Sequence, residues 1–191
     1  MDIFLRIYLF SGMLLHKVVW EYLKQKSPAQ AQKRPEKFSF KSVIKIGKIG
    51  FLLFLFLQVI LLAPILPLAD QPALLRIAGV VIYSLGLVIA ISGRIQLGKN
   101  WANLEDYQVM QEQKLVEQGI YRWIRHPIYS GDLLLVLGVE LALNSWLVLL
   151  IIPLAAVVYR QAKEEEKILS RAFSGYPAYR ERTKMFLPFV I

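Results

Sequence analysis

Residues of the types that most often perform chemistry are scarce in this 191-residue chain. It has two histidines, His16 and His126, and no cysteine, which excludes a thiolate metal site, a cysteine nucleophile and a disulfide framework. Two histidines make a poor metal site, so no metal is predicted. The chain also lacks a Gly-x-x-x-x-Gly-Lys-Ser/Thr loop, a Gly-x-Gly-x-x-Gly turn and a recognisable Ser-His-acid set. The familiar soluble nucleotide-binding folds are therefore not expected.

The candidate that remains is the run Arg125-His126-Pro127-Ile128-Tyr129. Proline is favoured in the first turn of a helix, where its missing N–H has no intrahelical partner. His126 and nearby backbone donors would then lie at a helix N-terminus, which favours a bound carboxylate. The alternative is that Arg125 and His126 simply mark a membrane interface, and spacing alone does not separate the two.

The elements that must position this run are apolar, because charge and hydrophobicity are segregated along the chain. The sequence is 56% hydrophobic, yet its formal net charge is +9. Residues 51–68 and 74–91 have almost no charge, whereas residues 24–48 and 162–184 are crowded with it. About 20 apolar residues in a helix cross a bilayer core of about 30 Å. The pattern predicts an integral membrane protein.

We predict an all-α, polytopic fold with five transmembrane helices. The predicted spans are residues 3–23, 43–68 and 74–97, followed by a helical hairpin within residues 128–162. The hairpin should turn at Asn144, where Asn144-Ser145 interrupts the apolar run, and Pro153 should kink its second arm because it removes a backbone donor.

Lysine and arginine alternate between the predicted connections. They are frequent after the first and third helices and in the C-terminal tail, and absent from residues 69–72 and from the hairpin turn. Basic loops stay in the cytoplasm, so the N-terminus should be outside and the C-terminus cytoplasmic, in a bacterial or archaeal inner membrane or the endoplasmic reticulum. Because basic residues flank the spans, we expect contacts with membrane lipids and none with nucleic acid.

Two cytoplasmic segments, residues 97–129 and 163–191, are long enough to close over one site. Glu164, Glu165 and Glu166 are expected to open a helix in the second segment. Two acids inside the hairpin, Asp132 and Glu140, should face the protein interior, because an unpaired charge in a membrane helix costs about 2.5–3.5 kcal/mol on insertion scales.

Motifs in the second half of the chain resemble, in order, those of the isoprenylcysteine carboxyl methyltransferase family, whose superfamily includes phospholipid N-methyltransferases. They are Leu97-Gly98-Lys99-Asn100-Trp101, Lys114-Leu115-Val116, Gly119-Ile120-Tyr121-Arg122, Arg125-His126-Pro127-Ile128-Tyr129-Ser130-Gly131, and Glu164-Glu165-Glu166 with Leu169, Tyr176, Tyr179 and Leu187-Pro188. The resemblance covers residues 94–191 and implies a catalytic region there. Hydropathy alone predicts the N-terminal membrane helices in residues 1–93, and we expect one integrated domain.

The resemblance further implies an S-adenosylmethionine-dependent methyltransferase acting on a lipophilic small molecule or prenylated acceptor at an isoprenylcysteine-like carboxylate. Arg160, Glu164 and Arg125 would be catalytic, and Arg160 would contact the acceptor. Either acid of the hairpin could line the acceptor path, and the position of Asp132 nearer the cofactor end favours it over Glu140. The implied cofactor contacts are Gln108, Gln113, Lys114, Leu115, Val116, Tyr121, His126, Pro127, Ile128, Tyr129 and Glu164. The family usually has histidine where this chain has Gln113, which cannot become cationic.

Three alternatives stay open on the sequence. The acceptor could be a phospholipid amine or a small thiol, in which case acidic and aromatic residues would matter more than Arg160. A NADPH-dependent sterol-type membrane reductase would have a related C-terminal half, although this chain has no arginine cluster placed for a 2′-phosphate. A non-enzymatic membrane scaffold is the third alternative, but it does not account for the ordered cytoplasmic motifs.

Overall fold

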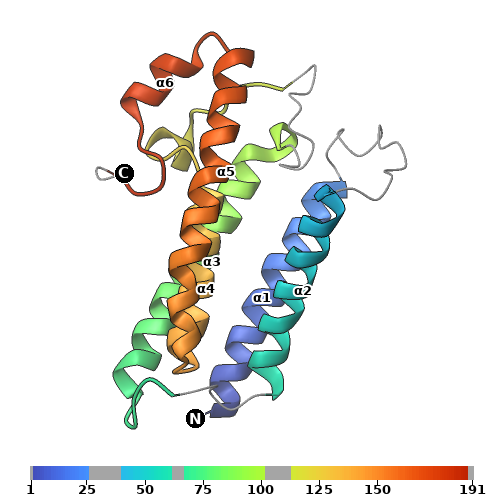
Figure 1. Ribbon diagram of the computed structural model, residues 1–191. Helices are drawn as coiled ribbons and strands as arrows, with labels where there is room; N and C mark the ends of the chain where they lie inside the picture. Colours follow the sequence, from blue (N-terminus) through green and yellow to red (C-terminus); the bar gives the residue numbers. More distant parts are fainter. Residues whose placement is uncertain (1, 26–39, 62–66, 102–112, 189–191) are drawn as a thin grey trace.

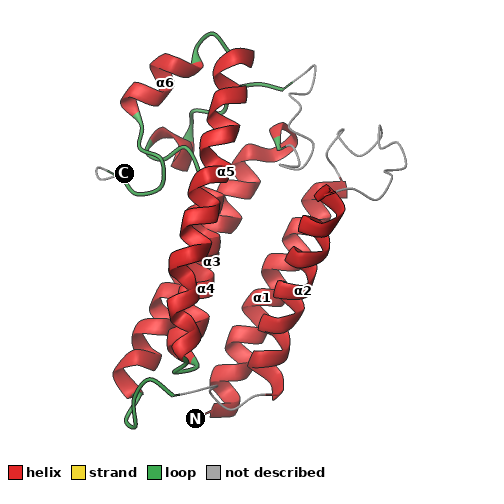
Figure 2. Cartoon of the chain, in the orientation of Figure 1, coloured by secondary structure: helices red, strands yellow, loops and turns green. Residues whose placement is uncertain are grey.

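The computed structural model describes residues 2–25, 40–61, 67–101 and 113–188 (Figure 1). All regular secondary structure in these ranges is helical (Figure 2), which confirms the all-α class. A helix occupies each of the five segments predicted to span the membrane. These helices are α1 (Asp2–Gln25), α2 (Phe40–Leu61), α3 (Ala73–Leu97), α4 (Pro127–Ala142) and α5 (Ile151–Ala172). Shorter helices are η2 (Gly98–Asn100), η3 (Gly119–Arg122), η4 (Trp146–Leu150) and α6 (Tyr176–Arg182).

Within the described ranges, three helical segments are long and apolar enough to cross a membrane: Ile3–Gln25, Ala73–Asn100 and Trp146–Ala172. The apolar part of α2, Ile49–Ile60, is shorter, and α4 has 16 residues, about 24 Å of helix. The structure therefore supports an integral membrane protein. The five spans and their sidedness stay predictions.

The predicted hairpin turn at Asn144 is confirmed. Asn144 has φ +57°, in the left-handed region that asparagine tolerates better than most side chains. Its side chain exchanges two hydrogen bonds with the backbone of Ala69, at 3.1 and 2.8 Å. The same asparagine therefore joins the α4–α5 turn to the segment before α3. The predicted second span was too long, because α2 ends at Leu61, and neither Pro67 nor Leu68 is helical.

One expectation for α5 was wrong. The helix is continuous from Ile151 to Ala172, so Glu164, Glu165 and Glu166 lie in its second half and not at a helix start. Pro153 is the third residue of α5, and the short helix η4 runs directly into it. The kink expected at Pro153 stays a prediction.

Helices α3 and α4 pack backbone to backbone through glycines. A Cβ atom added to Gly86 of α3 would lie 2.7 Å from the nitrogen of Leu135 and 2.8 Å from the carbonyl oxygen of Gly131, both on α4. Small residues allow this close approach between membrane helices, which then associate by van der Waals packing. The pair forms the rigid base on which the site described below is built.

Gly86→Ala should consequently lower the stability of the protein. Neither atom that the new methyl group would meet belongs to a flexible side chain, so α3 and α4 must separate, at a cost of about 1–3 kcal/mol. Gly47→Ala is the matched control, because a Cβ at Gly47 meets nothing within 4 Å. Tryptophan fluorescence during thermal unfolding in detergent should show a lower midpoint for Gly86→Ala only, and equal midpoints would contradict this packing.

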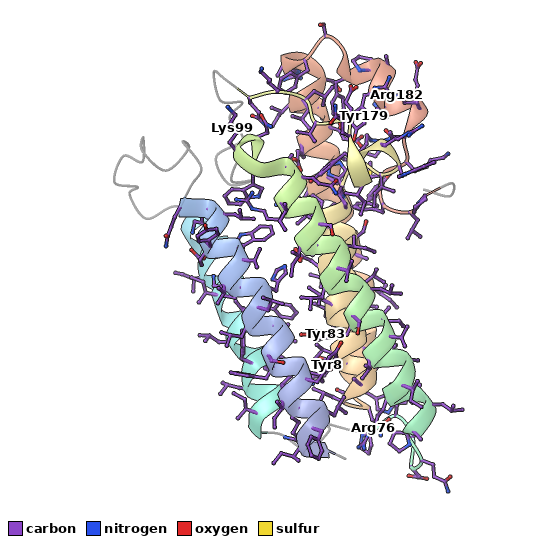
Figure 3. All side chains as sticks on the ribbon, turned by 180° about the vertical axis from the view of Figure 1, so that it is seen from behind. Tyr8, Arg76, Tyr83, Lys99, Tyr179 and Arg182 are labelled. Carbon is purple, nitrogen blue, oxygen red and sulfur yellow. The ribbon has the colours of Figure 1, made fainter. Side chains whose placement is uncertain are left out.

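A hydrophobic core between α1, α2, α3 and α4 lies next to this helix contact. Tyr83 is completely buried there and donates a hydrogen bond to the carbonyl oxygen of Leu9 at 2.6 Å (Figure 3). Glu140 faces the interior as predicted, 2% exposed, and accepts a hydrogen bond from Gln58 of α2 at 2.9 Å. Asp132 differs from the expectation: its side chain is 45% exposed, and one oxygen lies 3.3 Å from Nε2 of His16 on α1.

Candidate active site

The start of α4 has the predicted form. Pro127 is the first helical residue and His126 is the N-cap residue. His126 is buried, and its backbone N–H donates to the carbonyl oxygen of Met185 at 3.0 Å. Arg125 N–H donates in the same way to Lys184 at 2.8 Å, next to a parallel bridge between Ile124 and Lys184. The segment after α6 therefore lies against the start of α4.

Two of the three neighbouring glutamates face His126, and they are not the one implied by the resemblance. Glu166 Oε1 lies 3.4 Å from His126 Nε2, and Glu165 Oε2 lies 3.7 Å from Nδ1. Glu164 is exposed and pairs with Lys167 of the next turn at 2.6 Å. Successive helical residues are rotated by about 100°, so one face of α5 cannot present all three carboxylates. In the continuous helix α5, Ala162 and Glu166 are spaced i, i+4 and are both buried, so they mark the inward face. The sequence analysis expected a new helix start at Glu164, which hid this spacing.

Arg125 binds the C-terminal segment to α5. Its Nε donates to Glu166 Oε1 at 2.6 Å, and the two side chains are only 7% and 3% exposed. Its Nη1 donates to the carbonyl oxygen of Arg180 at 3.1 Å and also contacts Thr183. Through these contacts Arg125 positions α6 and the residues after it against α5. A catalytic role for Arg125 stays a prediction.

Aromatic rings surround His126. The ring of Tyr129 stacks on the imidazole with centroids 5.4 Å apart and planes 19° apart, and Phe186 lies at 5.9 Å. The Tyr129 hydroxyl donates to Glu165 Oε2 at 3.1 Å. Among the described residues, two buried atoms here have only ion-pair contacts and no well-formed hydrogen bond: Nε2 of His126, which lies 3.4 Å from Glu166 Oε1, and Oε2 of Glu166, which lies 3.7 Å from Arg180 Nε. We call His126, Tyr129, Glu165, Glu166 and Phe186 the His126 cluster.

Tyr121 connects the end of α3 to α6 and is too buried to present a ring face to a ligand. It is 5% exposed, its hydroxyl donates to the carbonyl oxygen of Gly93 at 3.2 Å, and its own carbonyl accepts from Tyr179 at 2.8 Å. Burial raises the pKa of the Tyr121 and Tyr179 phenols far above the ordinary value. Both phenols therefore stay neutral donors at physiological pH. The cofactor contact predicted for Tyr121 stays a prediction.

The implied cofactor strip at residues 113–116 is hydrogen-bonded to Asn100 of η2, directly after α3. Gln113 donates to the carbonyl oxygen of Asn100 at 3.0 Å, and the backbone N–H of Lys114 donates to the Asn100 side chain at 2.8 Å. Leu115 and Val116 are half-buried and lie outside any helix. Gln108 lies outside the described residues.

The structure brings some of the predicted residues together and not others. Arg125, His126 and Tyr129 meet at one end of α4, together with Glu165, Glu166 and Phe186, which the sequence analysis did not select. Pro127 and Ile128 pack against Gly93 of α3. Arg160 is exposed and makes no hydrogen bond or ion pair with the part of the chain that the structure describes. Asp132 faces α1 one turn along α4 from Ile128.

The His126 cluster is suited to binding and orienting a ligand. The half-exposed carboxylate of Glu165 and the aromatic faces favour a cationic group, since a cation over an aromatic ring is stabilised by about 0.5–2 kcal/mol, whereas Glu166 is already paired with Arg125. The buried Nε2 of His126 and Oε2 of Glu166 have only long contacts, at 3.4 and 3.7 Å, and so retain hydrogen-bonding capacity for a ligand. The cluster can therefore hold a small ligand that has both a positive charge and hydrogen-bonding groups.

Comparison with known proteins places residues 74–175 in a match to the family model described as phospholipid methyltransferase. Protein-S-isoprenylcysteine O-methyltransferase B of Arabidopsis thaliana is 31% identical over 117 residues, 59% of this chain and 58% of that protein. The human protein-S-isoprenylcysteine O-methyltransferase is 27% identical over 134 residues, 65% of this chain and 45% of its own length. The chain thus spans about half the length of the curated relatives it matches.

Among solved structures, the eukaryotic intramembrane Ras methyltransferase, an isoprenylcysteine carboxyl methyltransferase, matches with a TM-score of 0.62. The match covers 97% of this chain and 68% of that chain at 21% identity. At this level of identity, the comparison shows that the membrane fold is shared.

Proposed function

Because the chain belongs to the phospholipid methyltransferase family, we propose that it is a membrane-embedded, S-adenosylmethionine-dependent methyltransferase for the carboxylate of a lipophilic, isoprenylcysteine-like acceptor. The predicted family membership is confirmed, and the relatives named above are carboxyl methyltransferases of isoprenylcysteine. The observation that most supports the activity is the His126 cluster at the end of α4, which brings a buried histidine, stacked aromatic rings and the half-exposed carboxylate of Glu165 together.

The residues present fit the cofactor. When bound, S-adenosylmethionine supplies a methyl group on a cationic sulfonium, so no covalent intermediate with the protein is needed. Tyr129 and His126 offer the stacked aromatic faces, and Glu165 a half-exposed carboxylate, for its cationic parts. His126 Nε2 offers a buried hydrogen-bonding atom. The strip at residues 113–116 remains a proposed contact, and we propose Glu165 in place of Glu164, which is exposed and pairs with Lys167.

The work of the protein is positioning and exclusion of water. Methyl transfer is a displacement, which is accelerated when the attacking oxygen is held at near-attack distance and is stripped of solvent. The burial of His126 and Glu166 provides a site of low water content at the membrane end of the cytoplasmic segments. We propose that the acceptor arrives through the bilayer, with Asp132 along its path, and that the cofactor enters from the cytoplasm.

Calorimetric titration of the detergent-purified protein with S-adenosylhomocysteine tests this proposal. We expect saturable binding by the wild type and binding weakened at least 10-fold in His126→Ala, since this change removes the stacking partner of Tyr129 and a buried polar group. Trp146→Phe is the control, because Trp146 is exposed at the opposite end of α4. A folded wild type that binds no S-adenosylhomocysteine would refute the methyltransferase assignment.

The acceptor is then identified by methyl transfer from radiolabelled cofactor. S-farnesylcysteine, phosphatidylethanolamine and a small alkyl thiol represent the carboxylate, amine and thiol classes. We expect label in S-farnesylcysteine, in a base-labile form because a methyl ester hydrolyses. Label only in phosphatidylethanolamine or the thiol would reject the carboxylate acceptor while retaining the methyltransferase.

A further inference from the structure

Arg94, in the last turn of α3, is a completely buried cation without a carboxylate partner among the described residues. It is 0% exposed. Its Nη1 donates to the carbonyl oxygen of Gly98 at 3.0 Å, but Nε and Nη2 are buried with no hydrogen-bond partner. A buried charge with unpaired donors is costly, so in native proteins it ordinarily has a function or a ligand.

Two indole rings cover the guanidinium. Its central carbon lies 4.5 Å from the ring centroid of Trp101 and 5.4 Å from that of Trp20 on α1. The rings meet edge to face, with centroids 5.6 Å apart. Cation–π contacts stabilise the charge, but an aromatic face does not satisfy in-plane N–H donors. Nε and Nη2 form one edge of the guanidinium, which a carboxylate fills with two parallel hydrogen bonds.

Arg94 lies at the same level of the bundle as the start of α4. The adjacent residue, Gly93, accepts a hydrogen bond from Tyr121, and a Cβ placed on Gly93 would lie 3.1 Å from Cγ of Pro127. Pro127 follows His126 directly, so the last turn of α3, which includes Arg94, lies at the same end of α4 as the His126 cluster. In Figure 3, the end of α3 at Lys99 is on the side of Tyr179 and Arg182, and Arg76 is at the opposite end.

From these contacts we infer that Arg94 binds the carboxylate of a ligand of this site. The inference rests on the proposed function, which supplies two carboxylates: that of the methionyl part of the cofactor and that of the acceptor. Arg94 suits either one better than the exposed Arg160, because an ion pair is stronger where water is excluded. Trp20 and Trp101 are only half-buried, so an indole can turn to admit the ligand without emptying the core.

The test compares S-adenosylhomocysteine with 5′-methylthioadenosine, which has the same nucleoside and thioether but no amino-acid carboxylate. Titrations use the intact protein in detergent as wild type, Arg94→Met and Arg94→Lys. If Arg94 holds the cofactor carboxylate, Arg94→Met lowers the affinity for S-adenosylhomocysteine about 10- to 100-fold and leaves the affinity for methylthioadenosine unchanged. Arg94→Lys keeps the charge but loses the two-donor edge, so its affinity for S-adenosylhomocysteine should lie between those of the wild type and Arg94→Met. Arg76→Met, at the far end of α3, is the control.

If Arg94 instead holds the acceptor carboxylate, S-adenosylhomocysteine binds Arg94→Met normally, while the KM for S-farnesylcysteine rises about 10- to 100-fold. A purely structural arginine would lower the unfolding midpoint and alter neither ligand selectively. We expect the midpoint of Arg94→Met to equal or exceed that of the wild type, since an unpaired buried charge is removed. Unchanged affinity and KM in a folded Arg94→Met would overturn the inference alone. Absence of binding to the wild type would overturn the proposed function and the inference together.

Discussion

Glu166→Gln should lower the free energy of unfolding by about 3–5 kcal/mol, because it leaves the buried Arg125 guanidinium without its counter-ion. The loss should be concentrated in the C-terminal segment. Arg125 also donates to the backbone of Arg180 and Thr183, so a displaced Arg125 releases α6 and the residues after it. Thermal unfolding followed by tryptophan fluorescence measures the first effect. The rate of tryptic cleavage near Arg180 measures the second.

The control for this variant is Arg182→Gln. Arg182 pairs with Glu117 across the same segment, but the two side chains are 57% and 35% exposed, and an exposed ion pair contributes about 0–1 kcal/mol. We also expect the double variant Arg125→Met with Glu166→Met to recover much of the lost stability, because no uncompensated charge stays buried. Equal destabilisation by Glu166→Gln and Arg182→Gln would show that the buried pair does not hold the segment.

Glu165→Gln should reduce methyl transfer about 10- to 100-fold, whereas Glu164→Gln should retain near-normal activity. Glu165 accepts the Tyr129 hydroxyl at 3.1 Å and lies 3.7 Å from His126, so loss of its charge removes a charge-assisted hydrogen bond from the cluster. Glu164 faces away and pairs with Lys167. The two substitutions are chemically identical and one residue apart, so each serves as the control for the other.

Initial rates at saturating acceptor, with calorimetry of S-adenosylhomocysteine, provide the measurement for this pair. The family resemblance implies the opposite order, with Glu164 as the cofactor contact. A larger loss in Glu164→Gln would therefore support the resemblance and would show that the face of α5 turned toward His126 is not the catalytic one. Equal, small losses would remove both glutamates from the mechanism.

The positions of the helices and several of their ends could be predicted from the sequence. Apolar runs of about 20 residues predict membrane helices because unsatisfied backbone groups are too costly in lipid. Pro127 predicted the start of α4 and Asn144 predicted the turn after it, and both were confirmed because they depend on the local backbone. The ordered motifs also predicted the family. The sidedness and the individual cofactor contacts stay predictions.

Which side chains meet depends on how the helices pack. The choice between Glu164 and Glu165 depends on whether α5 is continuous through residue 163, since a new helix start would rotate the face that it presents. The partners of Arg125 in α5 and in the C-terminal segment lie 41, 55 and 58 positions away in the sequence. Arg94 is buried because Trp20 of α1 and Trp101 beyond α3 both cover it. Hydropathy and turn chemistry act over a few residues, whereas burial and ion pairing depend on segments that become neighbours only when the chain folds.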